Sequence, residues 1–348
     1  MTGGLRIGVV GCGRATEQLH LPALARAAGA RAVAVVDPDP RRVAAALRRE
    51  PSLRVHDDHH ALAADPQVDV VAVCVPPALH AEVALAALAA GRHVYLEKPV
   101  AVTWDDATAI ADAARSAPGT VAMGFNLRSH RLVGEARAIL AAGAIGPVEL
   151  VRTTWTSGYN RGGEWPAWRD RRETGGGAIH EIAIHHLDLC AHLLGEELEI
   201  TAASSVDREV ADQSAVLIGR AAGGALVSIS AAQRTADVNE IEVFGRDGAL
   251  RFSLYRADSL QVRRGSDLAG GPRARLRQGL AAARRLPGAL VAARAGGDFL
   301  GSYTAHWEAT AAALRSGSPP PASLDDGLRA LALALAAVES ATAPGARL

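Results

Sequence analysis

Short apolar runs rich in β-branched residues alternate with alanine-rich stretches over the first third of the chain. Each apolar run has the length of a buried strand, and each alanine-rich stretch has the length of a crossover helix. Strands that are joined through helices run parallel, so the pattern predicts a doubly wound parallel sheet. The expected strands cover residues 5–10, 32–36, 68–75, 93–96 and 120–123.

The pattern changes after Gly146-Pro147, where strand-like stretches follow one another with Gly, Asp or Asn turns between most of them. Direct succession of strands is typical of an antiparallel sheet, and we therefore expect a second domain of the α+β class. Its expected strands cover residues 148–154, 200–206, 215–218, 225–231, 240–243 and 249–254.

Two helical segments are expected near the end of the chain. The Arg- and Ala-rich segment 263–294 predicts a helix broken near Pro287-Gly288, for which a solvated face is favoured over a partner-binding or substrate-covering role. Residues 323–341 predict a helix with Ser323 as its N-cap and acidic residues in its first turn.

Charge and composition limit the possible partners. Lys+Arg and Asp+Glu both number 37, so no net field attracts nucleic acid or an anionic membrane. No apolar run reaches about 18 uninterrupted residues, and a cytoplasmic protein is expected. The cysteines Cys12, Cys74 and Cys190 lie in apolar runs and are interpreted as small buried residues rather than as disulfides or metal ligands.

The first strand is followed by a glycine turn. Gly11 and Gly13 stand between this strand and an expected helix, where backbone amides can approach a pyrophosphate. Thr16 takes the third position of the G-x-G-x-x-G fingerprint, so helix and strand are expected to pack less closely there. Asp37 ends the second strand, where a carboxylate can bind an adenosine ribose and repel a 2′-phosphate. These features predict NAD binding, with Arg41 and Arg42 keeping NADP as the alternative.

The only lysine of the chain is Lys98, in "VYLEKPVAV"; every other basic residue counted as Lys or Arg is arginine. Lys98 follows the strand at 93–96 on its carboxyl side, which is the ligand-binding edge of a doubly wound sheet. Pro99 biases the preceding backbone toward an extended conformation. A lysine ammonium is compact and fits beside a single oxygen, whereas a guanidinium is larger and planar. We therefore expect Lys98 to contact the reacting oxygen of a substrate.

A second group of candidate residues lies in "GGGAIHEIAIHHLDLCAHLLG", residues 175–195. Helical spacing puts Glu181, His185 and Asp188 on one face, where neutral His185 can take a proton and Glu181 can orient its ring. The zinc motif H-E-x-x-H would need His at 184, and this position is Ile184. We therefore expect no metal site.

The segment just before this helix is rich in tryptophan. Flat aromatic faces suit the C–H faces of a sugar or cyclitol, and amide and guanidinium donors suit its hydroxyls. Anchoring of a long loop explains the same aromatic residues equally well. The residues concerned are Trp155, Tyr159, Asn160, Trp165, Trp168 and Arg169.

Together these stretches resemble the Gfo/Idh/MocA oxidoreductase family over nearly the whole chain. The resemblance rests on "GVVGCGR…LHLPAL", "VPPALHAEVALAALAAGRHVYLEKPVAVT", "MGFNLR", "GAIGPV", "GGGAIHEIAIHHLDL" and "SLDDGLRALALALAAVESA". It implies an N-terminal α/β Rossmann domain, residues 1–124, and a C-terminal α+β domain, residues 125–348. The second domain would have a large open-faced, mostly antiparallel sheet that binds substrate and often forms homodimers or homotetramers. Whether the helix near 323–341 packs back on the Rossmann domain is left open.

The resemblance also implies roles for individual residues. The catalytic residues would be Lys98, Glu181 and His185. The cofactor-binding residues would be Gly11, Cys12, Gly13, Arg14, Ala15, Asp37, Pro76, His80, Glu97 and Lys98, and the substrate-binding residues Asn126, Tyr159, Trp168 and Arg169.

The sequence departs from the family pattern at three positions. Glu181 replaces the usual Asp, Val75 replaces a frequent Ser or Thr, and Thr16 replaces a small residue. The implied activity is hydride transfer between NAD and a carbinol carbon of a sugar, cyclitol or related polyol. A lyase or glycosidase that oxidises its sugar transiently is one alternative. A catalytically silent cofactor-sensing regulator is another, against which Lys98 and His185 argue.

Overall fold

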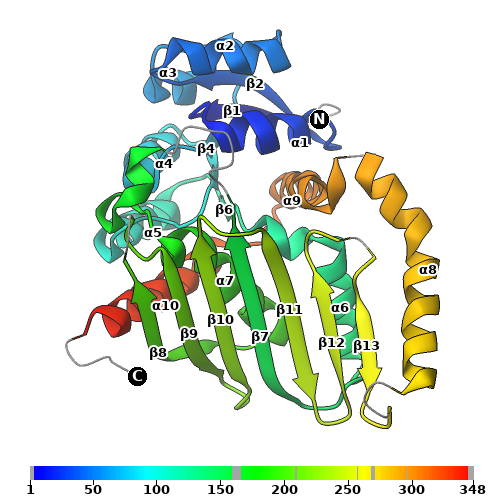
Figure 1. Ribbon diagram of the computed structural model, residues 1–348. Helices are drawn as coiled ribbons and strands as arrows, with labels where there is room; N and C mark the ends of the chain where they lie inside the picture. Colours follow the sequence, from blue (N-terminus) through cyan, green and yellow to red (C-terminus); the bar gives the residue numbers. More distant parts are fainter. Residues whose placement is uncertain are drawn as a thin grey trace. The chain divides into compact units, whose positions relative to one another are not determined.

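The computed structural model describes residues 4–158, 166–207, 210–256, 258–267, 271–294 and 296–343. The chain divides into two compact units, and each is described by itself. The first unit comprises Met1–Ser129, Glu173–Gly175 and Ser302–Leu331, and the second comprises His130–Arg172, Gly176–Gly301 and Ala332–Leu348. Figure 1 labels most helices and strands of both.

The first unit is built on a six-stranded parallel sheet in the order β3-β2-β1-β4-β5-β6. The strand order reverses between β1 and β4, and ligands of such sheets bind outside the carboxyl ends of the strands at this point. The predicted parallel sheet is confirmed, although the two-residue strand β3 was not anticipated. The strands are β1 (Leu5–Val10), β2 (Ala30–Val36), β3 (Arg54–Val55), β4 (Val70–Val73), β5 (His93–Leu96) and β6 (Val121–Met123).

Helices connect the parallel strands. Asp39, Asp58 and Thr103 cap three of them by accepting a backbone N–H of the first turn. Two more helices, α9 (Gly297–Ser316) and α10 (Leu324–Thr342), each contribute one part to this unit. The connecting helices are α1 (Leu21–Leu24), α2 (Pro40–Arg49), α3 (His59–Ala64), α4 (His80–Ala89) and α5 (Trp104–Ser116), with single turns η1 (Thr16–His20), η2 (Pro77–Leu79) and η3 (Asn126–Ser129).

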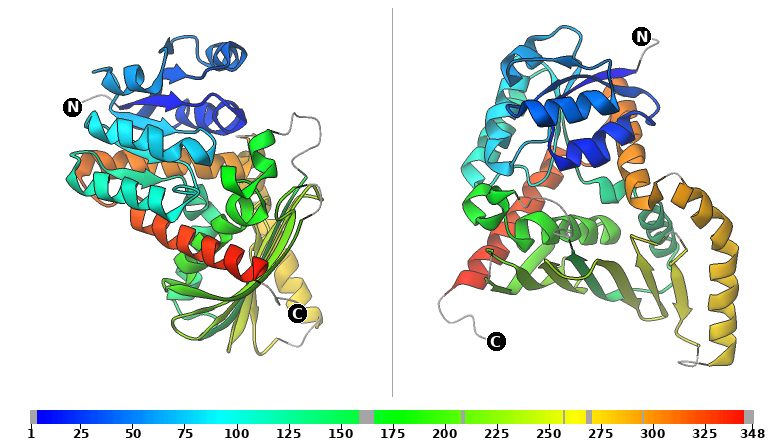
Figure 2. Two further views of the ribbon diagram at one scale, coloured as in Figure 1. Left: turned by 90° about the vertical axis from the view of Figure 1, so that its left-hand side faces the viewer. Right: turned by 45° about the horizontal axis from the view of Figure 1, so that its top comes forward.

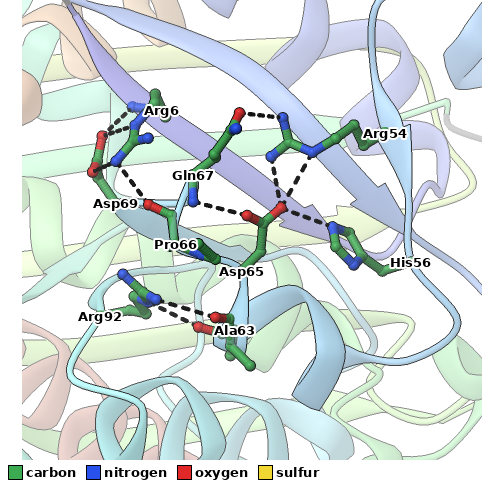
Figure 3. Close-up of polar contacts among 10 residues, drawn as sticks. Arg6, Arg54, His56, Ala63, Asp65, Pro66, Gln67, Asp69 and Arg92 are labelled. Carbon is green, nitrogen blue, oxygen red and sulfur yellow. Dashed lines mark hydrogen bonds and ion pairs between the residues drawn. The ribbon is translucent and has the colours of Figure 1, made fainter.

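Ion pairs connect strands of this sheet to the residues that precede β4 (Figure 3). Arg6, near the start of β1, lies 2.7 Å from Asp69, which precedes β4. Asp65 binds Arg54 at 2.7 Å and His56 at 3.1 Å. The hydrogen bond from Arg6 is the main reason why the pKa of Asp69 is lowered. These contacts join β1 and β3 to the residues just before β4, and they stabilise the unit.

The second unit contains a seven-stranded sheet in the order β13-β12-β11-β7-β10-β9-β8. Only β7 and β10 pair in parallel, and the predicted mostly antiparallel sheet is therefore confirmed. The strands are β7 (Val148–Ser157), β8 (Leu198–Val206), β9 (Ser214–Ala221), β10 (Leu226–Gln233), β11 (Val238–Gly245), β12 (Gly248–Ser253) and β13 (Gln261–Arg264).

One face of this sheet is covered by helices. In Figures 1 and 2, α6 (Arg131–Ala141) and α7 (Ile184–Leu194) pack on each other on that face, and α7 contacts β7 and β10. Three single turns precede α7: η4 (Ala167–Asp170), η5 (Arg172–Thr174) and η6 (Ile179–Ala183). The helix α8 (Pro272–Arg294) runs beside the edge strand β13. Among the helices in the described ranges, none is long and apolar enough to span a membrane.

The prediction for segment 263–294 is wrong in two respects. Its first residues belong to β13, and α8 continues unbroken through Pro287. Pro287 removes one N–H donor from the helix, which frees the carbonyl of Ala283. Both residues are exposed, so water can bind that carbonyl and the helix need not break.

The predicted N-cap of the last helix is confirmed. Ser323 Oγ accepts the N–H of Asp326, and the carboxylate of Asp326 accepts the N–H of Ser323 in return. This reciprocal pair is a capping box. Cys12 and Cys190 are buried free thiols as expected, whereas Cys74 is partly exposed.

Candidate active site

The glycine turn of the first unit leaves its ligand side open. Gly11 has a φ of +95°, and a Cβ there would lie 2.5 Å from the carbonyl oxygen of Cys74. At Gly13 an added Cβ would meet no atom within 4 Å. Residues 14–24 are helical, so the first amides after Gly13 belong to a helix N-terminus. The turn therefore combines open space with backbone donors, as a pyrophosphate site requires.

Thr16 is accommodated by a hydrogen bond. Its side chain is fully buried, and its Oγ1 donates to the carbonyl of Gly11 at 2.6 Å. The bond spans five residues and lies where a π-helical turn, η1, replaces the regular α-helix. The departure from a small residue thus gains a hydrogen bond that closes the turn.

Asp37 braces the same turn from the end of β2. Its Oδ2 accepts the N–H of Cys12 and its Oδ1 accepts the N–H of Asp39, both at 2.8 Å. Its side chain is only 3% exposed, and Arg42 lies 4.0 Å away. A carboxylate has about four acceptor positions, so two remain for ribose hydroxyls. Arg41 pairs instead with Asp39.

These residues fit a dinucleotide. Gly13 provides the open space, the helix from Arg14 and Ala15 provides amide donors, and Asp37 provides free acceptor positions in register with both. A 2′-phosphate in place of a ribose hydroxyl would meet the carboxylate of Asp37, and the set therefore favours NAD over NADP.

Two predicted cofactor-binding residues, Pro76 and His80, follow β4 and lie close to the loop that carries Lys98. His80 is fully buried, with Nδ1 2.7 Å from the carbonyl of Pro99 and Nε2 3.1 Å from that of Val75. Burial is the main reason why the pKa of His80 is lowered. Pro76 caps the short turn that leads into His80. His80 thus ties the loop after β4 to the loop after β5, and its contact with a cofactor stays a prediction.

Lys98 follows β5 and forms a cis peptide bond with Pro99. Its backbone N–H donates to Glu97 Oε2 at 3.2 Å. The other oxygen of Glu97 lies 3.1 Å from Nε2 of His20, the last residue of η1. The structure therefore links the glycine-turn helix to Lys98 through two side chains, of which sequence reasoning missed His20. Its only signal was a polar residue within the apolar stretch "LHLPAL".

Asn126 is buried in the first unit, where its Nδ2 donates to Ser302 Oγ at 2.7 Å. Among the described residues its Oδ1 has no hydrogen-bond partner. The predicted contact with substrate is not tested by this arrangement.

In the second unit, the candidate residues lie where the helix preceding α7 begins. An added Cβ at Gly176 would lie 2.3 Å from the carbonyl oxygen of Arg169, so the loop before the helix packs directly on its start. A π-helical turn, η6, then carries Glu181 and leads into α7 with His185. Such turns shift side chains around the helix axis relative to regular α-helical spacing.

Glu181 is a buried carboxylate with a polar neighbour at each oxygen. Its Oε1 lies 3.1 Å from Nε of Arg169, and its Oε2 accepts a hydrogen bond from Gln233 at 3.2 Å. The guanidinium of Arg169 also lies 5.1 Å from the ring centroid of Trp168. Arg169, predicted to bind substrate, is therefore placed against the predicted catalytic acid.

His185 lies beside an aromatic cluster. Its ring centroid is 5.0 Å from that of Trp155, and Trp155 donates its indole N–H to Tyr255 at 2.9 Å. Next to it, His186 lies 3.1 Å from Oδ1 of Asn239. Burial is the main reason why the pKa of His186 is lowered to about 4. His186 is thus neutral and fixed, with its Nε2 proton directed at the amide oxygen.

The helix-facing side of the sheet changes from apolar to polar along its strands. The buried residues in the middle of these strands are apolar: Val151, Ile229 and Ile241. Nearer the strand ends, the buried residues are Trp155 on β7, Gln233 on β10 and Asn239 on β11. Gln233 Oε1 is buried without a hydrogen-bond partner among the described residues, and the side chain of Asn239 also binds Tyr255. Buried polar atoms are almost always paired, so this end of the sheet has the donors and acceptors that a polar ligand needs.

Tyr159, together with Asn160 and Trp165, lies outside the described residues. Asp188 is buried in α7. Gln233, Asn239 and Tyr255 were missed; the signal for the first two was a polar residue at an inward position of an alternating strand.

Comparisons with known proteins agree with this architecture. Residues 5–125 match the model described as "Oxidoreductase family, NAD-binding Rossmann fold", and residues 133–251 match the Gfo/Idh/MocA C-terminal domain. Levoglucosan dehydrogenase of Pseudarthrobacter phenanthrenivorans is 29% identical over 68% of each chain. Myo-inositol 2-dehydrogenase of Thermotoga maritima is 28% identical over 97% of this chain and 96% of its own.

A solved structure of levoglucosan dehydrogenase in complex with NADH and levoglucosan superposes with a TM-score of 0.80 at 25% identity, covering 97% of both chains. The two family models together span more than half of the sequence. The chain belongs to the Gfo/Idh/MocA oxidoreductase family.

Proposed function

We propose that this protein is an NAD-dependent dehydrogenase that oxidises a carbinol group of a sugar, cyclitol or related polyol, or reduces the corresponding carbonyl. One observation carries the proposal: the only lysine of the chain stands two residues after the end of β5, at the carboxyl edge of the nucleotide-binding sheet. Relatives that are levoglucosan and inositol dehydrogenases support the substrate class.

The nucleotide would be held by the first unit. The amides that follow Gly13 face the pyrophosphate, and Asp37 accepts the ribose hydroxyls. When bound, the nicotinamide ring supplies a hydride acceptor. NAD is the expected form because Asp37 opposes a 2′-phosphate.

The side chains divide the remaining chemistry. Lys98 donates a hydrogen bond to the carbinol oxygen and stabilises the negative charge that develops there. His185 takes the hydroxyl proton as a general base. The C–H hydrogen leaves as a hydride while the C–O bond becomes a carbonyl, so two electrons and two hydrogens leave the substrate. Glu181, anchored by Arg169 and Gln233, supplies the fixed negative charge near the base.

Substrate contacts are proposed for the polar end of the sheet in the second unit. Trp155 offers a flat apolar ring, and Gln233 offers an amide oxygen that has no hydrogen-bond partner among the described residues. An aromatic face beside amide donors and acceptors suits a ring with C–H faces and hydroxyls. Trp168 and Arg169 lie on the loop before the same helix.

We also propose that the chain forms a homo-oligomer through the sheet of the second unit. Val216 and Ile218 on β9 are 45% and 40% exposed, while their neighbours Ala215 and Leu217 are buried. An apolar side chain on every second residue of the outer face is suited to burial against another copy. Analytical ultracentrifugation of Val216→Glu tests this: we expect dissociation, and an unchanged oligomer would contradict it.

The activity is tested by incubating the purified protein with NAD and a panel of sugars, cyclitols and linear polyols while following absorbance of the reduced nicotinamide. Turnover is expected with NAD and should disappear in Lys98→Met, the matched control that removes only the ammonium. Absence of turnover with every substrate and with both NAD and NADP would contradict the proposal.

A further inference from the structure

His20, a buried histidine close to the neighbour of Lys98 in the sequence, Glu97, has no part in the chemistry proposed above. His20 is fully buried and is surrounded edge-on by three aromatic rings. The ring centroids of Tyr95, Tyr303 and Trp307 lie 5.7, 5.2 and 6.0 Å from its own. A polar ring in such a site is costly unless its nitrogens are paired, so its partners identify its role.

Both nitrogens of His20 have partners. Trp307 donates its indole N–H toward Nδ1 at 3.3 Å, and Nε2 lies 3.1 Å from Glu97 Oε1. Indole is a donor only, so Nδ1 must present a lone pair to it. The ring proton is therefore on Nε2, directed at Glu97.

Burial and the neighbouring polar groups change the pKa of this ring in opposite directions. Burial lowers the pKa of His20, but Cys74 and Glu97 raise it by more, to about 10. A second proton would have to sit on Nδ1, where it would face the N–H of Trp307. In either protonation state Nε2 carries a proton, and it lies 3.1 Å from Glu97 Oε1.

Glu97 connects this ring to the catalytic lysine. Its second oxygen accepts the backbone N–H of Lys98 at 3.2 Å. Its side chain packs so closely on Gly124 that a Cβ there would lie 2.7 Å from Oε1. Gly124 in turn donates its N–H to the carbonyl of Leu96, the last residue of β5. The carboxylate is therefore confined between His20, Gly124 and the start of the loop that carries Lys98.

We propose that His20 and Glu97 are positioning residues for Lys98, with His20 fixing the carboxylate and the carboxylate fixing the backbone from which the ammonium extends. The proposal rests on the proposed function for its kinetic consequence and on these contacts for its structural one. A backbone that could rotate at Lys98 would swing the tip of a long side chain, and misplacement of a catalytic group by about 1 Å can cost about 100-fold in rate.

The lone lysine allows a direct structural test. A protein labelled with [15N]lysine, produced with a lysine-free tag, gives a single backbone amide signal, which is that of Lys98. A hydrogen bond to a carboxylate moves an amide proton downfield, so His20→Phe should shift this signal upfield or split it. Phenylalanine keeps a ring in the aromatic site and removes both nitrogens. His20→Gln, whose amide can donate to Glu97, should restore the signal toward its original position.

Kinetics provide the second readout. His20→Phe and Glu97→Gln should lower kcat by about 10- to 100-fold, as expected for a displaced catalytic group, while the Kd for NAD changes little. His20→Gln should recover part of kcat. Tyr95→Phe is the matched control: Tyr95 stacks on Trp307 at 4.0 Å, and its hydroxyl is buried without a hydrogen-bond partner among the described residues. It should leave both the lysine signal and kcat unchanged.

The outcomes separate this inference from the proposed function. An unmoved lysine signal in His20→Phe, or an equal shift in Tyr95→Phe, would overturn the positioning role whether or not a substrate has been found. A moved signal with unchanged kcat would overturn its importance for the reaction. If His20→Phe does not fold, the Glu97→Gln protein gives the same two readouts, because an amide can accept only one of the two donated protons.

Discussion

Each unit contains a helix that begins at a glycine turn and includes a π-helical turn, η1 in the first unit and η6 in the second. The glycines of the two turns serve different purposes. Gly13 has open space where its side chain would be, whereas at Gly176 that space is filled by the carbonyl of Arg169. The first helix thus presents backbone to a ligand, and the second packs backbone on its own loop.

The polar side chains of the two helices follow from this difference. In the first, His20 turns inward to a buried carboxylate, Glu97. In the second, the carboxylate is on the helix itself, where Glu181 pairs with Arg169 from the closely packed loop. We propose that the open backbone of the first helix binds the nucleotide, and that the side chains of the second helix, whose backbone is covered, take part in the reaction.

The largest effect is expected at Lys98. Lys98→Arg conserves charge, but the longer planar guanidinium should displace the substrate or the nicotinamide ring, and turnover should fall by about 100-fold or more. Turnover and NAD affinity are compared with those of Lys98→Met. Near-normal turnover of the Arg variant would show that only charge is needed at this position.

His185 is expected to follow closely. His185→Ala should lower turnover by about 100-fold, as loss of a general acid or base usually does, while NAD affinity stays nearly unchanged because the nucleotide belongs to the other unit. Fluorescence titration with NADH supplies the control measurement. A large loss of NADH affinity would contradict the assignment of nucleotide binding to the first helix and of proton transfer to the second.

The two glycine turns themselves offer a matched pair. Gly176→Ala places a methyl group against backbone 2.3 Å away and should lower the free energy of unfolding by about 1–3 kcal/mol. Gly13→Ala meets no atom within 4 Å and should fold normally, yet its methyl group occupies ligand space and should weaken NAD binding. Chemical denaturation and NADH titration of both variants separate the effects, and the same phenotype in both would remove the contrast.

The sequence allowed prediction of local patterns and not of their long-range partners. Apolar runs joined by helices predicted the first sheet, and strands in direct succession predicted the second, although β3 and β13 were missed. The glycine turn and Asp37 predicted NAD as the cofactor. The pairing of His20 with Trp307 joins residues 287 positions apart, and Gln233 reaches Glu181 across 52. No periodicity encodes such pairs, because they depend on which strands become neighbours. The break expected at Pro287 failed because exposure to water, which the sequence does not show, relieves the lost hydrogen bond.

Asp37 tests the nucleotide side more finely. Asp37→Ala should weaken NAD binding by about 10-fold, the equivalent of about 1.4 kcal/mol, and relax discrimination against NADP. Asp37→Asn retains an acceptor for one of the two backbone N–H groups but removes the negative charge. This variant therefore separates the structural role of the side chain in the turn from its repulsion of a 2′-phosphate. Tighter binding of NADP than of NAD by the unaltered protein would contradict the assignment and point to Arg41 and Arg42.

The smallest effect concerns protonation of His186, which lies beside the catalytic candidate His185. Burial lowers the pKa of His186 to about 4, whereas an unfolded chain has a histidine pKa of about 6.5. Above pH 6.5 both states are neutral and its contribution to stability is complete. As the pH falls below 6.5 the unfolded chain binds the proton first, so stability is lost progressively toward pH 4.

Between pH 7 and 5.5 this single group should account for about 1 kcal/mol of the free energy of unfolding. His130 and His306 also have pKa values lowered to about 4, so the unaltered protein should lose stability more steeply than one histidine explains. His186→Gln keeps a donor for Asn239 and removes the titration, and its pH dependence should be shallower by one proton. Denaturation curves at pH 7, 6.25 and 5.5 measure the slope. An equal slope in both proteins would mean that His186 is already protonated in the folded state, and that the amide of Asn239 does not hold it neutral.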